Sequence, residues 1–388
     1  MTTRFNRNFI TYLIIAGVSS FLLSLFLLQL FLGILSICWL LESFENKKKA
    51  LDIFTYFILV FGLIRILSII FSQYPSVSVQ SFYKDALFYF SFFSLTFYLK
   101  ALDKSKVEKI SYSFIISAVF IAVIGLVLFN LSLVDRAASF SSGYATFSSY
   151  LITALGVHLF MPYKIKVKHN WLLWPLGISL ILAAVITSLG RTNIIIAVLL
   201  ITASLFFKRI NILPLVSIII LTTLLCLFSF HNNNIEASRR VEDPTALSDR
   251  NILMEGAKAI ALEHPIIGFG PRTFKNIFPF HDRISDKLIG SWHNDFIQIY
   301  FESGAAGLLS FLSIIIAPLY FNYKYLKDKT QDLFYNNLAR GILFGIIALV
   351  LSAVTAGFID SPVLSIVFAF LISLLSSLIY HKNHLASS

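Results

Sequence analysis

Residues 10–41 read ITYLIIAGVSSFLLSLFLLQLFLGILSICWLL, a run of 32 residues without a charged side chain. A single helix of that length would extend about 48 Å, whereas the hydrocarbon core of a bilayer is about 30 Å thick. We therefore predict that the run forms two membrane-spanning helices joined by a tight hairpin near Ser24. One long span is the alternative, because the charge pattern supports this first hairpin only weakly.

The rest of the chain repeats this pattern. Of the 388 residues, 57% are hydrophobic and 13% are charged, against about 25% charged in soluble domains. The mean hydropathy is +0.81. Together these values predict an all-α polytopic membrane protein, in which residues 1–388 form one bundle of about twelve transmembrane helices. The further apolar runs lie at 54–72, 86–99, 110–131, 145–162, 171–189, 192–207, 212–230, 296–322, 341–357 and 362–380.

The basic residues predict the orientation of the bundle. A net charge of +11 could indicate nucleic-acid binding, but the positive residues stand in short clusters between apolar runs, as topology signals do. The short segments of one face contain only Lys84, Arg136 and Arg191. We therefore predict that both termini are cytoplasmic. The segments of that cytoplasmic face contain Arg4, Arg7, Lys47, Lys48, Lys49, Lys100, Lys104, Lys106, Lys109, Lys164, Lys166, Lys168, Lys208, Arg209, Lys324, Lys327, Lys329, Arg340 and Lys382.

One long polar segment, residues 231–292, lies on the outer face. It carries eight Lys or Arg and eight Asp or Glu, so we predict a near-neutral, folded periplasmic loop. Within it, Leu253, Ala257, Ile260 and Ala261 recur at helical spacing. The pattern predicts an amphipathic helix capped by Ser248, with Asp249 in its first turn, that ends at His264-Pro265. The free N–H groups at the start of this helix favour an anion.

Arginines on the outer face are the first candidate functional residues. Arg191 occupies a turn of two or three residues between apolar runs, Arg136 stands at another span boundary, and Arg65 lies inside the third span. Because guanidinium groups bind phosphate in a bidentate manner, several converging arginines predict a site for a lipid-linked phosphate or diphosphate. The structural alternative is that each arginine reaches the headgroups or pairs with an acid. The long loop adds Arg239, Arg240, Arg250 and Arg272.

His293 is the second candidate, because it follows the interfacial Trp292 at the start of the tenth span. An imidazole suits proton transfer near neutral pH, although a structural hydrogen bond is the alternative. The sequence contains no HExxH, no paired Cys, no Walker motif and no GxSxG. If the chain is an enzyme, we expect it to act without a metal, cofactor or nucleotide, through arginine electrostatics and a histidine.

Three stretches within residues 175–315 resemble the O-antigen ligase and polymerase superfamily of bacterial envelope proteins. They are Ser188-Leu189-Gly190-Arg191; Asp249-Arg250 through His264-Pro265-Ile266-Ile267-Gly268-Phe269-Gly270; and His293-Asn294 followed after nine residues by Gly304-Ala305-Ala306-Gly307. The H-N-x9-G-x-x-G spacing resembles the motif of the ligase branch. Gly190 departs from the Ser-Arg pairing that is usual in the family, so a hydroxyl partner for Arg191 is in question.

The resemblance implies glycosyl transfer at the periplasmic face of a bacterial inner membrane. The donor would be a glycan on undecaprenyl diphosphate, and the acceptor a hydroxyl of the lipid A–core oligosaccharide. Arg191 and Arg250 would stabilise the leaving diphosphate, and His293 would take the acceptor's proton in a metal-independent, inverting reaction. Further substrate contacts are expected from Arg136, Arg272, Arg240 and Asn294.

The sequence is also compatible with other functions. A polymerase would use the same donor with a second lipid-linked repeat as acceptor, and another relative attaches glycans to proteins such as pilin. A transporter or flippase for lipid-linked sugar should instead show internal repeats, broken spans and polar residues at mid-membrane. The candidate residues gather at the outer face, which favours surface chemistry with lipids as partners and no nucleic acid.

Overall fold

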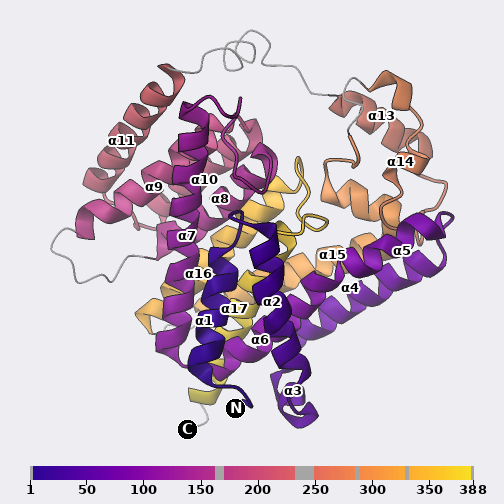
Figure 1. The fold of residues 1–388 in the computed structure, drawn as a ribbon, viewed down its shortest axis with the longest axis horizontal. Helices are drawn as coiled ribbons and strands as arrows, with labels where there is room; N and C mark the ends of the chain where they lie inside the picture. Colours follow the sequence, from indigo (N-terminus) through magenta and orange to yellow (C-terminus); the bar gives the residue numbers. More distant parts are fainter. Residues whose placement is uncertain (1–2, 162–169, 232–248, 285–288, 328–331, 386–388) are drawn as a thin grey trace.

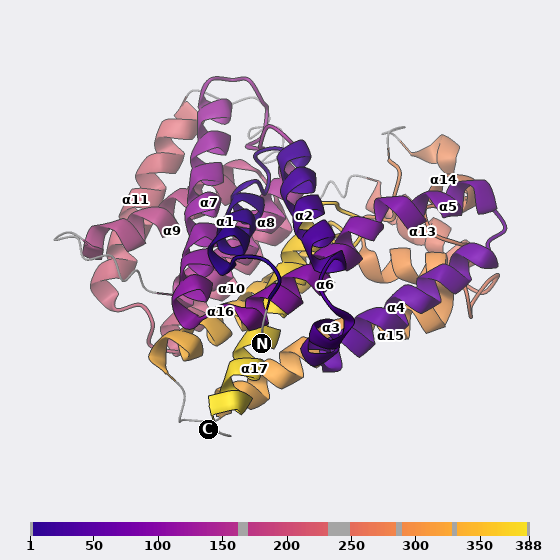
Figure 2. The same cartoon turned by 60° about the horizontal axis from the view of Figure 1, so that its bottom comes forward.

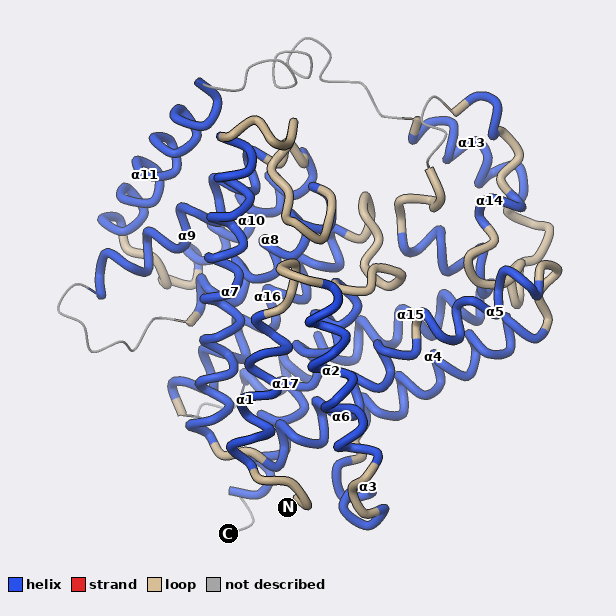
Figure 3. Tube along the Cα trace, in the orientation of Figure 1, coloured by secondary structure: helices blue, strands red, loops and turns tan. Residues whose placement is uncertain are grey.

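The computed structural model describes residues 3–161, 170–231, 249–284, 289–327 and 332–385. Within these ranges every regular element is a helix, as the tube in Figure 3 shows, so the all-α prediction is confirmed. Each apolar run forms a helix, and the first run forms two. They are α1 (Arg7–Ser19), α2 (Leu25–Leu40), α4 (Ile53–Ile70), α6 (Ala86–Ala101), α7 (Lys104–Asn130), α8 (Tyr144–Phe160), α9 (Asn170–Thr187), α10 (Arg191–Phe206), α11 (Ile212–His231), α15 (Asp295–Lys327), α16 (Leu333–Ser352) and α17 (Leu364–Leu385).

The break in the first run falls where the sequence predicts it. Ser24 is the N-cap of α2 and its hydroxyl accepts from the N–H of Leu27 at 3.3 Å, which starts a new helix within the apolar run. Leu22 has φ +56 in the turn before it. The helices α1 and α2 have 13 and 16 residues, which at 1.5 Å per residue makes each shorter than the hydrocarbon core.

The chain is a multi-pass membrane protein. Among the described residues, six helices are long and apolar enough to cross a bilayer, or seven if α2 and the short α3 (Phe44–Ala50), bent by 114°, form one span. The count of about twelve spans and the periplasmic side of the long loop remain predictions. Both termini and α3 lie at one end of the molecule, opposite the segment that contains α13 (Arg250–Ile260) (Figure 1).

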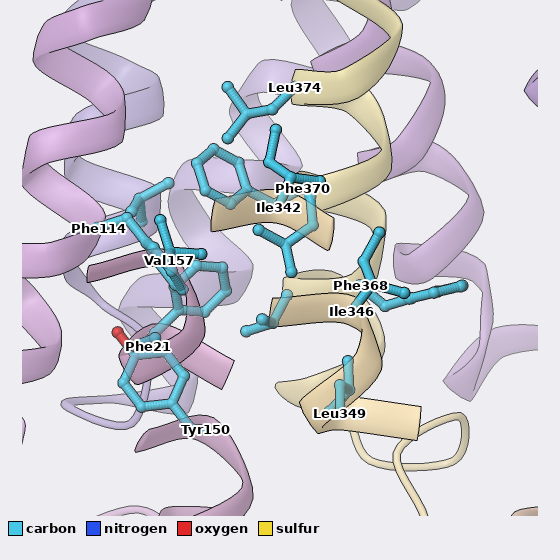
Figure 4. Packing of buried hydrophobic residues seen from close by; sticks show 14 of the residues in the cluster. Phe21, Phe114, Tyr150, Val157, Ile342, Ile346, Leu349, Phe368, Phe370 and Leu374 are labelled. Carbon is cyan, nitrogen blue, oxygen red and sulfur yellow. The ribbon is translucent and has the colours of Figure 1, made fainter. Parts of the chain in front are cut away.

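Apolar side chains hold the bundle together where α8 packs against α16 and α6 against α17. At its centre, the ring centroids of Phe21 and Phe114 are 6.2 Å apart, and those of Phe114 and Phe370 are 5.4 Å apart (Figure 4). Tyr150 and Val157 of α8 face Ile346 and Leu349 of α16 in the same cluster. This core places the start of α10 beside the end of α16.

The outer segment folds around its own core. Leu253, Ala257 and Ile260 of α13 are buried, which confirms the predicted apolar face. The helix is capped differently from the prediction: Asp249 occupies the N-cap with φ +59, and Ser248 lies outside the described residues. It also ends at Ile260, before His264-Pro265, because the chain turns there to dock on α15. The same core contains Phe274 of α14 (Phe274–Ile277) and Phe278, which directly follows this helix. It also contains Ile284, which follows a 3-10 turn (His281–Arg283), and Trp292.

The helix α15 extends beyond the bundle. It is not one straight rod, because Gly304 has a non-helical backbone with φ +64 and divides its 33 residues into two helical segments. In both Figure 1 and Figure 2, α4 and α15 run side by side away from the bundle and carry α13, α14 and the short α5 (Pro75–Lys84) at their far end. The elements that bear the sequence motifs therefore stand on this projecting pair.

Candidate functional site

Arg191 begins α10 after a three-residue turn that starts at Ser188. Leu189 adopts φ +55, which closes the turn tightly, and the Arg191 side chain is half-buried. Two residues later, the amide of Asn193 donates to the hydroxyl of Ser148 on α8 at 2.7 Å. The start of α10 is therefore fixed against α8, and with it the backbone that carries Arg191.

Arg136 lies at the same turn. Its Nε donates to the carbonyl oxygen of Ser188 at 2.9 Å, and its guanidinium carbon lies 3.1 Å from the centroid of the Tyr144 ring. The neighbouring N–H of Ala137 donates to the carbonyl oxygen of Thr187 at 3.1 Å. Two of the predicted arginines thus meet at one turn, although they are far apart in the sequence.

Arg250 joins the outer segment to the connection between α16 and α17. It is the first residue of α13, and its Nη2 donates to the carbonyl oxygen of Thr355 at 3.2 Å. We call residues 353–363 the α16–α17 loop. This contact places the first turn of the amphipathic helix directly over that loop.

The segment that contains His293 also contacts the α16–α17 loop, through Asp295. The imidazole of His293 is exposed and its backbone has φ +50, so the chain reverses immediately before α15. Asp295, which is 2% exposed, fixes this position: its N–H donates to the carbonyl oxygen of Ala353 at 3.0 Å. Its carboxylate accepts from the N–H groups of Phe358 at 2.6 Å and Ile359 at 3.1 Å.

Asn294 caps α15. Its side-chain oxygen accepts from the N–H groups of Phe296 at 2.9 Å and Ile297 at 3.2 Å, which satisfies two donors at the helix start. The structure therefore gives Asn294 a structural task in addition to the predicted contact with substrate. That contact stays a prediction.

The α16–α17 loop is the common neighbour of these segments. Ser352, at the end of α16, lies 2.6 Å from Ser149 of α8, hydroxyl to hydroxyl. Ser149 is next to Ser148, which holds the start of α10 through Asn193. Hydrogen bonds thus connect the Arg191 turn, the Arg250 helix and the His293 segment to one short stretch of chain, residues 352–355. Arg240 lies outside the described residues.

Arg272 has a different environment from the one its predicted role requires. Its Nη2 pairs with Asp85 at 2.8 Å, and its backbone N–H donates to the carboxylate of Glu302 at 2.7 Å. The backbone of Arg272 has φ +63. The pKa of Arg272 is raised, because the carboxylates of Asp360 and Asp85 outweigh the opposing effect of burial. A guanidinium held among carboxylates is poorly placed to bind a diphosphate, so Arg272 fits a positioning task better.

Arg272 belongs to a buried ionic network that we define as Arg65, Asp85, Arg272, Glu302 and Asp360. Arg65 of α4 is 5% exposed and donates through Nη1 to Glu302 of α15, which is 1% exposed. Its Nη2 lies 3.3 Å from Asp85 and 3.5 Å from Asp360. Arg65 therefore belongs to a buried structural ion pair, which agrees with one of the two alternatives that the sequence leaves open.

Glu302 connects this network to the histidine. One carboxylate oxygen accepts from Arg65, and the other accepts from the N–H of Arg272 and from the amide of Gln298. Gln298 in turn accepts from the N–H of Trp292 at 3.0 Å, immediately before His293. The network thus holds the backbone immediately before the imidazole.

Asp360 is the network member nearest to solvent, with a side chain 25% exposed. Burial, together with the carboxylates of Glu302 and Asp85, raises the pKa of Asp360 well above its ordinary value of 3.8, although Arg65 and Arg272 oppose the shift. The network holds three carboxyl groups and two guanidinium groups, so its acidic members outnumber its basic ones.

Two of the sequence motifs dock through their backbones. The N–H of Phe269 donates to the carbonyl oxygen of Phe301 at 2.7 Å, and that of Ala305 donates to Pro265 at 2.7 Å. Gly304 interrupts α15 with φ +64, and a Cβ there would lie 2.1 Å from the carbonyl carbon of Ile266. The glycines at this site therefore have a steric function: they let one motif lie directly on the other.

The sequence alone missed Glu302, Asp85 and Asp360. A signal was present, because Glu302 stands inside an apolar run, where a charge is costly without a partner. Across the described residues, no group of three or more His, Cys, Asp or Glu is arranged to hold a metal ion.

A comparison with protein families supports the reading of these motifs. The family model described as O-antigen ligase matches residues 176–312, which include Arg191, Arg250 and His293. The resemblance to the O-antigen ligase superfamily is thereby confirmed for the segment from α9 to the middle of α15. A search of curated proteins finds no match.

Proposed function

We propose, from this similarity to the O-antigen ligase superfamily, that the protein is an O-antigen ligase. In this proposal it transfers a glycan from undecaprenyl diphosphate to a hydroxyl of the lipid A–core oligosaccharide at the periplasmic face of the inner membrane. The observation that supports it most is the convergence of three motif segments on the end of α16 and the loop that follows it. Arg250 contacts Thr355, Asp295 contacts Ala353, and the start of α10 reaches Ser352 through Ser149.

The arginines serve the leaving group. When the bond between the anomeric carbon and the diphosphate breaks, negative charge grows on the phosphate oxygens, and preorganised cations stabilise it. Arg191 and Arg250 take this role in our proposal. Arg136, stacked on Tyr144, either adds a contact to the diphosphate or fixes the turn that presents Arg191.

The histidine serves the acceptor. His293 is exposed at the start of α15, where an acceptor sugar has access to it. In our proposal the imidazole takes the proton of the acceptor hydroxyl while that oxygen attacks the anomeric carbon, and undecaprenyl diphosphate leaves from the opposite face. The anomeric centre is inverted, and neither a metal nor a nucleotide is required.

A polymerase is the second candidate, because the family match does not separate it from a ligase. Both use the same donor and the same leaving-group chemistry. They differ in the acceptor, which for the polymerase is a second lipid-linked repeat. The candidate residues gather near one end of the molecule, which supports surface chemistry over transport of a lipid-linked sugar by a flippase.

Deletion of the gene followed by electrophoresis of lipopolysaccharide tests the proposal. A ligase predicts the loss of all O-antigen from the core and the accumulation of lipid-linked polymer. A core that carries a single repeat identifies a polymerase instead. An unchanged pattern contradicts both functions.

A further inference from the structure

The helix α5 presents its apolar residues outward. In a water-soluble fold an amphipathic helix turns its apolar side to the core. In α5 the reverse holds: Ser78 and Ser81 are 0% and 2% exposed, whereas Val79, Phe82 and Tyr83 are 53%, 65% and 64% exposed. The five residues recur at helical spacing, so α5 has a polar inner face and an apolar outer face.

The inner face has fixed polar partners. The hydroxyl of Ser78 lies 2.7 Å from that of Ser72, which donates to the carbonyl oxygen of Phe269 at 2.7 Å. Ser81 donates to Asp85 of the buried ionic network and accepts from Arg65 at 3.4 Å. Turning the apolar side inward would remove these bonds and leave Arg65 with fewer partners, so the orientation of α5 is fixed by its contacts.

The apolar face continues the surface of a membrane-crossing helix. The helix α4 qualifies as a span, and its last two turns expose Leu63 by 58%, Leu67 by 39% and Ile70 by 64%. Phe71, in the turn to α5, is 63% exposed. In Figure 1 and Figure 2, the chain turns back after α4, and α5 lies beside the far part of α4, so that Ser81 and Asp85 at the end of α5 contact Arg65 of α4.

A second exposed apolar segment adjoins α5. Leu262 is 86% exposed and Ile266 is 70% exposed, although both lie outside any candidate span. His264 lies between these two residues in the sequence. The side-chain nitrogen of Gln73, just before α5, lies 2.9 Å from a ring nitrogen of His264. This hydrogen bond joins the turn after α13 to the start of α5.

We propose that the exposed apolar residues of these two segments form one lipid-contacting surface, which we call the α5 surface. It consists of Val79, Phe82, Tyr83, Leu262 and Ile266. The surface lies in the boundary region of the bilayer, against the acyl chains. Lipid is the occupant in this proposal because α5 packs beside α4, a helix that qualifies as a membrane span and exposes apolar side chains of its own.

The proposal fixes the depth of the outer segment. If α5 lies in the boundary region, one helix separates the buried ionic network from the acyl chains. The network is then not covered by a loop that lies in water. The α5 surface then anchors the outer segment to the membrane at a second point besides α15. This inference does not depend on the chemistry proposed for the site.

Collision measurements on spin labels test the proposal. The two native cysteines, Cys38 and Cys226, are replaced by alanine, and single cysteines are introduced at Val79, Phe82 or Leu262. Each is labelled with a nitroxide in the full chain, reconstituted in phosphatidylcholine–phosphatidylglycerol vesicles. The control is Lys258→Cys on the exposed side of α13. Power saturation then compares collisions with oxygen, which concentrates in lipid, and with a water-soluble nickel chelate.

We expect the labels at the three apolar positions to favour oxygen over the chelate by several-fold more than the label at Lys258. Chelate collisions at Val79 and Phe82 equal to those at Lys258 would place the helix in water and overturn the proposal. Low collision rates with both agents would show that another protein or a second copy covers the surface, which also overturns it. A Leu262 label that matches Lys258 would refute the joint surface.

Discussion

Substituting glutamine for Glu302 removes the charge at the centre of the buried ionic network while keeping the size of the side chain. Glu302 is 1% exposed and pairs with Arg65, which is 5% exposed. Removing one partner of a buried pair generally costs about 3–5 kcal/mol, because the other charge stays buried without compensation. Asp85 and Asp360 remain 3.3 and 3.5 Å from Arg65, so we expect a loss near the lower end, about 3 kcal/mol.

The chain offers a matched control for this substitution. Glu255 and Arg283 form an ion pair at 2.7 Å, but their side chains are 54% and 51% exposed. An exposed pair contributes about 0–1 kcal/mol, so Glu255→Gln should change stability little. Apparent melting temperatures of both variants, measured in the same detergent, compare a buried and an exposed pair of the same chemistry.

A double substitution sharpens the test. If Glu302 acts mainly by compensating Arg65, Arg65→Gln combined with Glu302→Gln should cost less than the two single changes added together. Equal melting temperatures for Glu302→Gln and Glu255→Gln would refute the reasoning. So would strict additivity of the two buried substitutions.

Three further outcomes follow from the same geometry. Gly304→Ala should destabilise the protein by at least about 1–2 kcal/mol, because φ is +64 and the new Cβ meets Ile266. It should also speed amide exchange over residues 265–270. Gly33→Ala is the control and should do neither, because nothing lies within 4 Å of a Cβ at that position. Asn294→Ala should lower stability by about 1 kcal/mol through loss of the cap, and Asn294→Asp should retain it; equal melting curves would contradict the capping role. Because the pKa of Asp360 is raised in the folded protein, the native state holds its proton more tightly than the unfolded chain, so this group's contribution to stability falls as pH rises above 3.8 towards the raised value. Asp360→Asn should flatten that part of the unfolding profile, and an unchanged profile would show that another group titrates.

The sequence predicts the local features of this fold well. The apolar runs, the break near Ser24, the tight turn before Arg191 and the apolar face of α13 all depend on residues close together in the chain. Helical periodicity, capping and turn length determine such features before any tertiary contact forms. The meeting of Arg250 and the His293 segment could be anticipated only from the resemblance to a family.

The features that the sequence does not predict depend on contacts between distant segments. Arg65 and Glu302 are 237 positions apart, so neither residue indicates which acid or base will be its partner. The orientation of α5 is likewise set by the loop around Phe269, since an isolated PSVSVQSFYK helix does not specify which of its faces meets protein. Arg272 was expected near the diphosphate because it is an outer arginine, and only the fold reveals its partner Asp85.

The central claim is that His293 performs proton transfer beside arginines that hold the diphosphate. The most direct test expresses His293→Ala in a deletion strain, with His281→Ala, another exposed histidine of the outer segment, as the control. At matched membrane levels, we predict that His293→Ala lowers O-antigen attachment about 10²–10⁴-fold and that His281→Ala leaves it near normal. A normal lipopolysaccharide ladder from the His293→Ala protein would contradict the account.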